Sequence, residues 1–407
     1  MESAEFSRDP YPLLAALRSR GPVQRVRTGN GRTTWVVTGW AEARVALADP
    51  RLSKDTARYF AGRPSSRDLA PAVSRTMLAT DPPDHGRLRK PAMAAFTPAA
   101  VARLEPRIRA IAQELADGLA ARGSADLVEE FAVPLPIAVI CELLGVPESE
   151  RAAVRRWSNE LFAAADPDTA DRASHALSDF MTRLVATRRA APGDDLLSEL
   201  IAARDQEDRL SEPELVSLAV LLVVAGHETT TNLIGNGALV LLRDDALRAR
   251  LCADPGLLPA AVEEFLRYDA PLTLATFRYA TEPFELGGAR IGAGDVVLVS
   301  PGAANRDPAR FAAPDEVRPG RPGGHLSFGH GPHRCLGAPL ARAEARIAFE
   351  VLLARFPDIR PAVARWDDLE WRRTRLMRGL TSLPVLLGDP TSTGVPAVRD
   401  NRGHDDG

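Results

Sequence analysis

The sequence predicts a mainly α-helical protein with a small β region, and three observations support this fold class. A continuous apolar segment from Leu215 to about Leu242 is long enough to form one central helix. Amphipathic helical patterns, separated by proline and glycine, occupy residues 127–144, 147–164, 170–191 and 194–204. Runs rich in β-branched residues are confined mainly to residues 23–38 and 271–300, which predicts little sheet.

The first 123 residues combine short helices, a hairpin and a long loop. Helices are expected at residues 12–20, 41–48 and 97–123, and a β-hairpin is expected to join 23–27 to 34–38 around the Gly29-Asn30-Gly31 turn. Residues 51–79 are loop-rich. Loops of this length in compact proteins often serve as lids over a site, and a plain surface loop is the alternative.

Short strands and one further helix are expected after the central helix. The predicted β segments are residues 272–279, 284–286, 289–291 and 296–299, with turns at Gly287-Gly288 and Gly292. A helix follows from Leu340 to Phe356, and residues 380–383 are expected to form a return turn toward a pocket. We find no linker, so residues 1–388 are expected to form a single domain. Residues 389–407 are polar and are expected to be a disordered tail.

Composition restricts the class of protein. The 407 residues carry a net charge of −3, from 51 basic and 54 acidic residues, which argues against nucleic acid as a partner. The three cysteines show no paired spacing, as expected in a reducing cytosol. The N-terminus is polar and has no apolar signal core, so we expect a cytoplasmic protein without a membrane anchor.

The segment from Phe328 to Gly337 is the strongest candidate site. It contains three glycines and Cys335, and a helix is predicted immediately after it, so the thiol would lie just before a helix N-terminus. Such a position is expected to lower the thiol pKa and to stabilise the anion. The residues alone leave three readings open: a metal or cofactor ligand, a nucleophile paired with His330 or His333, or a small buried side chain. A zinc site is disfavoured because Cys141 and Cys252 are remote.

The middle of the predicted central helix contains polar and small residues that are unusual in an apolar helix. Ser211 and Glu214 form a capping box before it, and Gly226, Glu228 and three threonines interrupt its apolar run, so it is not a membrane span. Leu218, Leu222, Ala225 and Thr229 lie at steps of four, three and four and share one face. Small residues there leave room for a bound group. The alternative is a buried helix whose threonine hydroxyl bonds back to the Ala225 carbonyl.

Two motifs resemble the cytochrome P450 family. The first is Phe-Gly-x-Gly-x-His-x-Cys-x-Gly followed by x-x-Leu-Ala-Arg, at residues 328–342, which resembles the family's haem-binding signature. The second is Ala-Gly-x-Glu-Thr-Thr at residues 225–230, which resembles its oxygen-activating motif. The resemblance implies a soluble bacterial-type haem-thiolate monooxygenase in which haem b lies between the central helix and the cysteine loop.

The resemblance also implies roles for individual residues. Cys335 would be the thiolate ligand of the haem iron, with Phe328 and Gly337 in the same loop. Thr229 would hydrogen-bond dioxygen and Glu228 would relay protons, beside an oxygen pocket made by Ala225 and Gly226. The residues implied to contact the haem propionates are His85, Arg89, Arg278, His325 and His333. Glu264 and Arg267, three residues apart, would be a buried structural pair.

Substrate and partners follow from the same resemblance. An apolar pocket is expected from Leu222, Ala225, Leu272, Leu274, Phe277 and Leu380, which suits a bulky lipophilic molecule such as a polyketide, macrolide, terpenoid or steroid. Hydroxylation or epoxidation is expected. The alternatives are peroxide-driven or oxidative-coupling chemistry, or a haem carrier without turnover.

The sequence contains no flavin or iron–sulfur motif, so electrons are expected from a separate ferredoxin and an NAD(P)H-dependent ferredoxin reductase. A small acidic ferredoxin would dock near Lys90, Arg334 and Arg346. The protein is expected to be a monomer.

Overall fold

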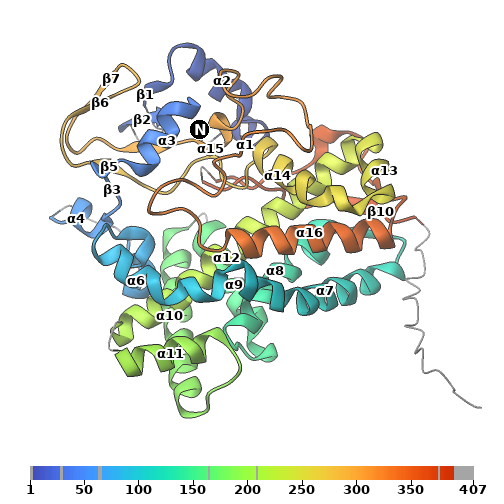
Figure 1. Ribbon diagram of the computed structural model, residues 1–407, viewed down its shortest axis with the longest axis horizontal. Coiled ribbons are helices and arrows are strands. Elements are labelled where there is room, and N and C mark those ends of the chain that lie inside the picture. The colour runs from blue at the N-terminus through green and yellow to red at the C-terminus, as the bar shows by residue number, and fades with distance from the viewer. Residues whose placement is uncertain are drawn as a thin grey trace, which may run out of the picture.

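The computed structural model describes residues 3–27, 31–62, 67–163, 166–207, 210–374 and 376–388. Most of the strands gather with the N-terminal helices at the upper left of Figure 1, whereas β10 (Pro384–Leu386) lies at the right near α13 (Asp245–Ala253). The predicted tail at 389–407 and part of the predicted hairpin turn lie outside the described residues. The mainly helical class with a small β region is confirmed.

The helices lie close to the predicted segments, with most boundaries shifted by one to three residues. The α-helices are α1 (Ala4–Arg8), α2 (Tyr11–Ser19), α3 (Trp40–Ala48), α4 (Thr56–Phe60), α5 (Pro71–Ser74), α6 (Asp84–Met93), α7 (Pro98–Ala120), α8 (Pro134–Leu143), α9 (Glu148–Ala163), α10 (Pro167–Ala190), α11 (Leu196–Glu207), α12 (Glu212–Arg243), α13 (Asp245–Ala253), α14 (Leu258–Tyr268), α15 (Pro301–Ala304) and α16 (Ala338–Arg355). Short 3-10 turns are η1 (Met77–Ala79), η2 (Ala94–Phe96), η4 (Pro255–Leu257) and η5 (Trp366–Asp368), and η3 (Val128–Ala132) is a π-helix. The helix expected at 127–144 is therefore divided into η3 and α8. The loop expected at 51–79 contains α4, α5 and η1.

Within the residues that the structure describes, the strands form four small sheets. They are β1 (Val23–Arg27), β2 (Thr33–Val37), β3 (Leu52–Ser53), β4 (Ser124–Asp126), β5 (Tyr279–Ala280), β6 (Phe284–Leu286), β7 (Ala289–Ile291), β8 (Val297–Val299), β9 (Arg360–Pro361) and β10 (Pro384–Leu386). β1 and β2 pair antiparallel with Val23 opposite Val37, and β2 pairs parallel with β8. The other sheets are β4–β10–β9, β3–β5 and β6–β7. The predicted pairing of β1 with β2 is confirmed, and β6 also pairs antiparallel with β7 across Gly287-Gly288.

One predicted strand is largely wrong. Of residues 272–279, only Tyr279 belongs to a named strand. The backbone of this segment bonds to different partners in turn, because the Thr273 N–H donates to the Leu376 carbonyl at 2.9 Å and the Ala275 N–H donates to the Val299 carbonyl at 2.7 Å. The segment bridges two parts of the fold and cannot form a continuous ladder.

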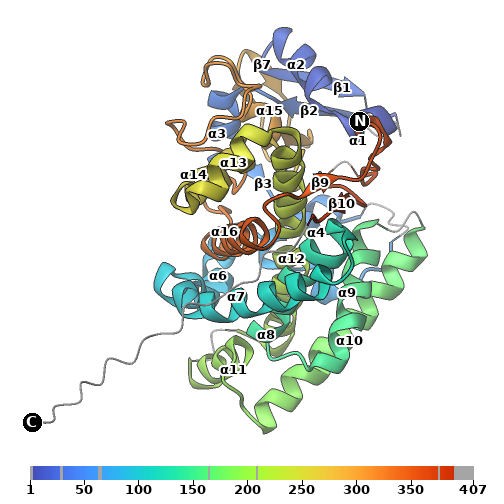
Figure 2. The same cartoon turned by 90° about the vertical axis from the view of Figure 1, so that its right-hand side faces the viewer.

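α12 is the central element of the helical region (Figures 1 and 2). It begins three residues before the prediction, because both hydrogen bonds of the Ser211–Glu214 capping box are present and Pro213 lies in the first turn. Among the described helices it is the one long and apolar enough to cross a membrane, but 78% of that apolar window is buried inside the protein. Packing against α8, α14 and α16 explains why it is apolar on all sides.

Candidate active site

The loop before α16 folds so that the Cys335 side chain lines a cavity of about 300 Å³. Gly329 and Gly331 have positive φ angles of 71° and 73°, and the Cys335 N–H donates to the Phe328 carbonyl at 2.8 Å, which closes the turn. A Cβ on Gly331 would lie 2.9 Å from the Ala48 Cα, so α3 and this loop approach as closely as glycine allows. The loop is therefore fixed by its own hydrogen bonds and by α3.

The electrostatic environment of the Cys335 thiol differs from the prediction. Its side chain is exposed to the cavity rather than to bulk solvent, and this burial raises the pKa of Cys335. The Gly337 N–H and the charges of Arg89, Arg342 and Arg334 act to lower the pKa but do not outweigh burial. The start of α16 therefore acts to lower this pKa, as expected, but the net shift is upward because burial is the larger effect. A bound cation would reverse the balance, because a thiol that coordinates a metal is deprotonated.

No hydrogen bond links the Cys335 sulfur to His330 or His333 within the described ranges. The His333 ring lies instead against the His85 ring, with the ring centroids 4.0 Å apart. A cysteine nucleophile activated by histidine therefore has no support in the geometry. The described residues also contain no group of three or more His, Cys, Asp or Glu side chains suited to a metal ion.

Five basic side chains gather on one wall of the same cavity. They are Lys54, His85, Arg89, Arg278 and His333. His85 and Arg89 are four residues apart on α6, as the sequence predicts. Lys54 follows β3, is only 3% exposed and donates from Nζ to the Thr276 hydroxyl at 2.6 Å. Four separate segments thus bring positive charge to one place.

The pKa values in this cluster show that its charges oppose one another. Burial, followed by the charge of Arg278, lowers the pKa of Lys54 well below its usual value. Burial and the charges of Lys54, His85, Arg278 and Arg89 lower the pKa of His333 to about 2. Asp81 is the acid that acts on Lys54, His85 and Arg278 from nearby. A wall with this excess of buried positive charge suits a ligand that carries carboxylates.

The middle of α12 also lines the cavity. Leu222, Ala225, Gly226 and Thr229 line the cavity, and the Thr229 hydroxyl donates to the Ala225 carbonyl at 3.1 Å. This back-bond is the self-satisfied arrangement that the sequence left open. Glu228 does not line the cavity: it is 1% exposed and forms an ion pair with Arg372. Burial acts to raise the pKa of Glu228, but His227 and Arg372 outweigh it and lower the pKa.

Several predicted residues lie elsewhere. Leu272 lines the cavity, but Leu274, Phe277 and Leu380 are not among its lining residues. Arg278 lines the cavity, whereas its neighbour Phe277 packs against Tyr59 and Phe60. Met377, three residues before Leu380, lines the wall in its place.

His325, which the resemblance assigns to the haem propionates, does not line the cavity. Its Nε2 lies 3.2 Å from a Glu263 oxygen, and its Nδ1 accepts from the Ser327 N–H at 3.1 Å. Both ring nitrogens therefore face groups outside the cavity. His333, in contrast, lines the cavity, as the resemblance implies.

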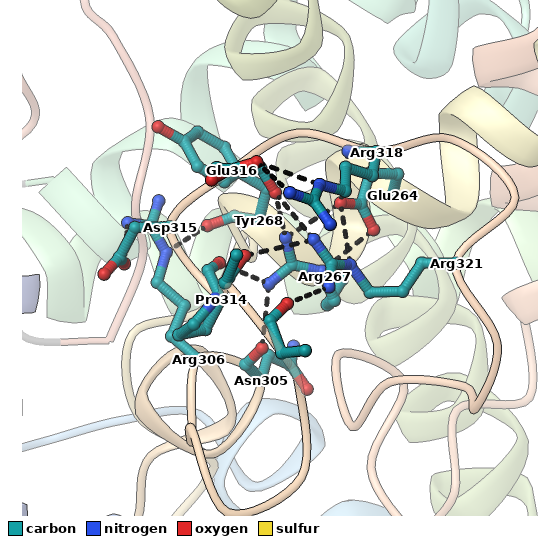
Figure 3. A network of polar contacts seen from close by, with 12 residues as sticks. Glu264, Arg267, Tyr268, Asn305, Arg306, Pro314, Asp315, Glu316, Arg318 and Arg321 are labelled. Atoms are coloured by element: carbon teal, nitrogen blue, oxygen red, sulfur yellow. Dashed lines mark hydrogen bonds and ion pairs between the residues drawn. The ribbon is translucent and has the colours of Figure 1, made fainter.

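Glu264 and Arg267 form the buried pair that the sequence predicts (Figure 3). Two hydrogen bonds of 2.8 Å join them, and their side chains are 2% and 3% exposed. Arg267 also donates to the carbonyls of Asn305, Pro314 and Glu316, at 3.0, 2.8 and 2.9 Å. The pair thereby attaches the segment after α15 to α14, behind the cysteine loop.

Comparison with known proteins identifies the family. The family model described as Cytochrome P450 matches residues 253–378. Cytochrome P450 107B1 of Saccharopolyspora erythraea is 47% identical over 391 residues, which cover 94% of this chain and 96% of that protein. The chain belongs to the cytochrome P450 family.

Two further relatives of this cytochrome P450 agree. Cytochrome P450 monooxygenase PikC of Streptomyces venezuelae is 46% identical over 385 residues, covering 94% of this chain and 92% of PikC. The solved structure of the tirandamycin C-bound P450 monooxygenase TamI matches with a TM-score of 0.88 and 46% identity, covering 95% of this chain and 99% of TamI. The chain is thus a P450 monooxygenase, an enzyme whose cofactor is haem iron.

Sequence reasoning missed several residues around the cavity of this P450. Four of them line the cavity: Lys54, Met77, Glu344 and Met377. The other three do not line it: His227 and Arg372 contact Glu228, and Arg321 contacts Glu264. Arg321 donates to Glu264 at 3.3 Å, and Glu344 is a fully buried acid whose pKa burial raises well above its usual value. Only Lys54 could have been singled out from the sequence, because it is one of two lysines in a chain that otherwise uses arginine. The others depend on contacts between distant segments.

Proposed function

We propose that this P450 inserts one oxygen atom into a C–H or C=C bond of a bulky lipophilic natural product of the polyketide or macrolide kind. The observation that supports the reaction is the cavity that unites Cys335, the basic cluster and Thr229. Two relatives support the substrate class. They are 6-deoxyerythronolide B hydroxylase of Saccharopolyspora erythraea, 43% identical, and mycinamicin IV hydroxylase/epoxidase of Micromonospora griseorubida, 44% identical.

The residues present fit a haem b group. Cys335 would hold the iron, and the basic cluster of Lys54, Arg89, Arg278 and the two histidines would hold the propionates, which supply the negative charge that this wall lacks. Gly337 lines the cavity and a Cβ there would meet no protein atom within 4 Å, which fits a surface that a flat ring covers. When bound, the haem supplies the oxidising chemistry, and the protein supplies binding, orientation and protons.

The proton-handling side is proposed to be α12. The Thr229 hydroxyl faces the cavity and, by leaving its bond to the Ala225 carbonyl, could donate to dioxygen. Glu228 lies one residue earlier, is buried and is held by Arg372, so it can pass protons toward Thr229 without contacting substrate. The small side chain of Ala225 leaves space between α12 and the cofactor, whereas a Cβ at Gly226 would meet Ile140 of α8 at 3.4 Å.

The substrate pocket is proposed to be mainly apolar. Its lining includes Met77, Leu78, Leu222, Leu272, Leu376 and Met377. Methionine side chains adapt to irregular shapes, so they suit a large ligand held by contact area rather than by a charge. These residues replace Leu274, Phe277 and Leu380 as candidates for specificity.

We place the enzyme in the cytoplasm, where a small acidic ferredoxin and its NAD(P)H-dependent reductase would supply electrons. Lys90 and Arg334 are exposed and suit the docking role. Arg346 suits it less, because it already pairs with Glu105 and Glu350 at 2.7 Å each. Lys90→Glu and Arg334→Glu are expected to slow reduction about tenfold at low salt, with substrate binding unchanged. Arg290→Glu on β7 is the matched control, and equal reduction rates in all three variants would refute this docking site.

The decisive test of the cofactor is the absorption spectrum of the dithionite-reduced protein with carbon monoxide. A strongly red-shifted Soret band is expected for wild type and for Cys252→Ser, and its loss is expected for Cys335→Ser. An ordinary haem–carbonyl band in wild type would refute thiolate ligation, and absence of haem would refute the proposed function.

The reaction is then tested with ¹⁸O₂, NADPH, ferredoxin and reductase on lipophilic compounds that shift the haem spin state. One ¹⁸O atom in the product is expected. Turnover that requires added peroxide instead would favour the peroxide-using alternative. Thr229→Ala is expected to divert electrons to hydrogen peroxide, whereas an unchanged variant would indicate a haem carrier.

A further inference from the structure

His227 is a buried titratable residue that the proposed mechanism does not use. It is 0% exposed and lies beside Glu228 on α12. Its Nδ1 lies 2.9 Å from the Val223 carbonyl oxygen, and its Nε2 lies 3.4 Å from a Glu228 carboxylate oxygen. No hydrogen-bond partner with good geometry satisfies Nε2. A buried imidazole with one nitrogen unsatisfied and aimed at an acid needs an explanation.

The contacts determine which nitrogen holds hydrogen. A carbonyl oxygen can only accept, so Nδ1 must be the donor to Val223. In a neutral imidazole Nε2 would then be a bare lone pair facing a carboxylate, and two acceptors repel each other. One additional proton, on either Nε2 or the Glu228 carboxyl, removes this repulsion. The pair His227–Glu228 is therefore built to hold one proton between its two members.

Arg372 decides where that proton resides. Its guanidinium pairs with the other Glu228 oxygen, from the segment before β10, and so favours the carboxylate form. With Glu228 negative, the proton belongs on Nε2 of His227. Within the described part of the chain, Glu228 is the acid that lies within ion-pair distance of His227. From α8, which also packs on α12, the side chain nearest to Gly226 is the apolar Ile140.

We infer that His227 is an imidazolium that supplies protons to Glu228 during oxygen activation. This inference rests on the proposed function, in which insertion of one oxygen atom consumes a substrate, one dioxygen, two electrons from the redox partner and two protons, and yields product and water. His227 gives its Nε2 proton to Glu228, Glu228 passes a proton toward Thr229, and His227 regains a proton from solvent. Arg372, 14% exposed, brings this buried group within one side chain of the surface.

His227 acts through Glu228 and touches neither substrate nor cofactor, so it is a positioning and proton-supplying residue. This role differs from a purely structural one in a way that can be measured. Glutamine at position 227 can still donate a hydrogen bond to Glu228, but it has no titratable proton. A structural role would survive His227→Gln, and a proton-supplying role would not.

The first test is spectroscopic and needs no turnover. The haem-loaded protein, reduced and bound to carbon monoxide so that it is diamagnetic, is prepared with ¹⁵N-labelled histidine, and His227 is assigned from the His227→Gln spectrum. Both ring nitrogens are expected to be protonated at pH 7, and Nε2 is expected to lose its proton in Glu228→Gln. A neutral ring in wild type, or no response to Glu228→Gln, would overturn the inference. His175→Gln, which removes an exposed histidine on α10, is the control.

The second test is the coupling of NADPH oxidation to product, with 6-deoxyerythronolide B as the probe macrolactone. His227→Gln is expected to lower coupled product formation by about 10²-fold, at the lower end for loss of a positioned acid, and to raise peroxide release. His175→Gln should behave as wild type. Wild-type coupling in His227→Gln would overturn the supply role.

The two tests separate the inference from the function on which it rests. If the wild type forms no product from any spin-shifting compound, the proposed function fails, and the NMR experiment still decides whether His227 and Glu228 share a proton. If product forms but His227 is neutral, the inference alone fails. If His227→Gln does not fold, the wild-type NMR spectrum over a range of pH remains the deciding measurement.

Discussion

Replacing Glu264 by glutamine is expected to remove a large share of the stability of this enzyme. The Glu264 carboxylate accepts two hydrogen bonds from Arg267, one from the Arg318 N–H at 2.7 Å and one from Arg321 at 3.3 Å. Glutamine keeps the shape of the side chain but leaves two buried guanidinium groups without a counter-charge. Removing one partner of a buried ion pair costs about 3–5 kcal/mol.

That cost is large compared with the total stability of a protein, which is about 5–15 kcal/mol. At about 4 kcal/mol the ratio of folded to unfolded protein falls roughly a thousandfold. Urea unfolding of the haem-loaded protein, followed by far-UV circular dichroism, measures this loss. The matched control is Glu285→Gln, because the Glu285 and Arg290 side chains of this ion pair are 67% and 90% exposed. Breaking such a surface pair should cost about 1 kcal/mol or less.

A second variant tests the reason for the loss. Replacing both Glu264 and Arg267 by leucine removes the unpaired charge, which in many proteins restores stability. Here Arg267 also satisfies three carbonyls of the segment after α15, and each of these loses its donor at about 1–3 kcal/mol. The double variant should therefore remain at least about 3 kcal/mol less stable than wild type. If Glu264→Gln lies within about 1 kcal/mol of wild type, or if the double variant recovers fully, the ion pair does not anchor this segment in the way described.

Three further predictions concern the cavity and its surroundings. Gly331→Ala should lose at least about 1–2 kcal/mol of stability, because φ is 73° and the new Cβ meets Ala48. Gly337 has a φ of −77°, and a Cβ there would meet no protein atom within 4 Å. Gly337→Ala should therefore unfold like wild type but take up haem more weakly. Lys54→Met should stabilise the haem-free protein, since burial lowers the pKa of this lysine, and should weaken haem binding. Thermal melts measure the stability, and haem titration measures the affinity. A variant that is more stable and also binds haem more tightly would contradict the assignment of Lys54 to the propionates. Burial acts to raise the pKa of Glu263, but His325 and Arg342 outweigh it and lower the pKa to about 2. The stability from this shift is present above the unfolded pKa of about 4.5 and is lost as pH falls from there toward 2. Acid unfolding of Glu263→Gln should therefore show about 1–3 kcal/mol less pH dependence across that window.

The sequence was sufficient wherever function depends on local pattern. Cys335, Thr229, His85, Arg89 and Arg278 belong to short motifs, and the structure brings all five to one cavity. Their positions follow from helical spacing and from the turn that two positive-φ glycines permit. For such residues the chain within ten positions contains most of the information.

The sequence was insufficient wherever the direction of a side chain depends on contacts with distant segments. Leu274, Phe277 and Leu380 were expected in the pocket because they are apolar and near matched motifs. In the structure, segment 272–279 bonds alternately to residues near 376 and 299, and this pattern turns Phe277 outward. His325 failed for a similar reason, since its partner Glu263 lies on α14, 62 positions away. The helical and strand periodicities of the sequence do not indicate contacts between residues so far apart in the chain.

The pKa of the Cys335 thiol is a second property that the local sequence does not determine. The position of the thiol before a helix is confirmed, and that position alone predicts a lowered pKa. Burial in the cavity is the larger effect and raises the pKa. Burial is a property of the tertiary fold, so the sign of the shift could not be obtained from the local sequence.

The meeting of Cys335 with the middle of α12, about a hundred residues away in the chain, has a simple mechanical cause. α16 begins at Ala338, three residues after the cysteine, and packs directly against α12 and α14. The cysteine loop therefore cannot move independently of the α12–α16 contact. Gly331 fixes the other side of the loop against α3. The distance between the thiol and the Thr229 face is thus set by helix packing on one side and by a glycine contact on the other, which makes the catalytic geometry a consequence of the core.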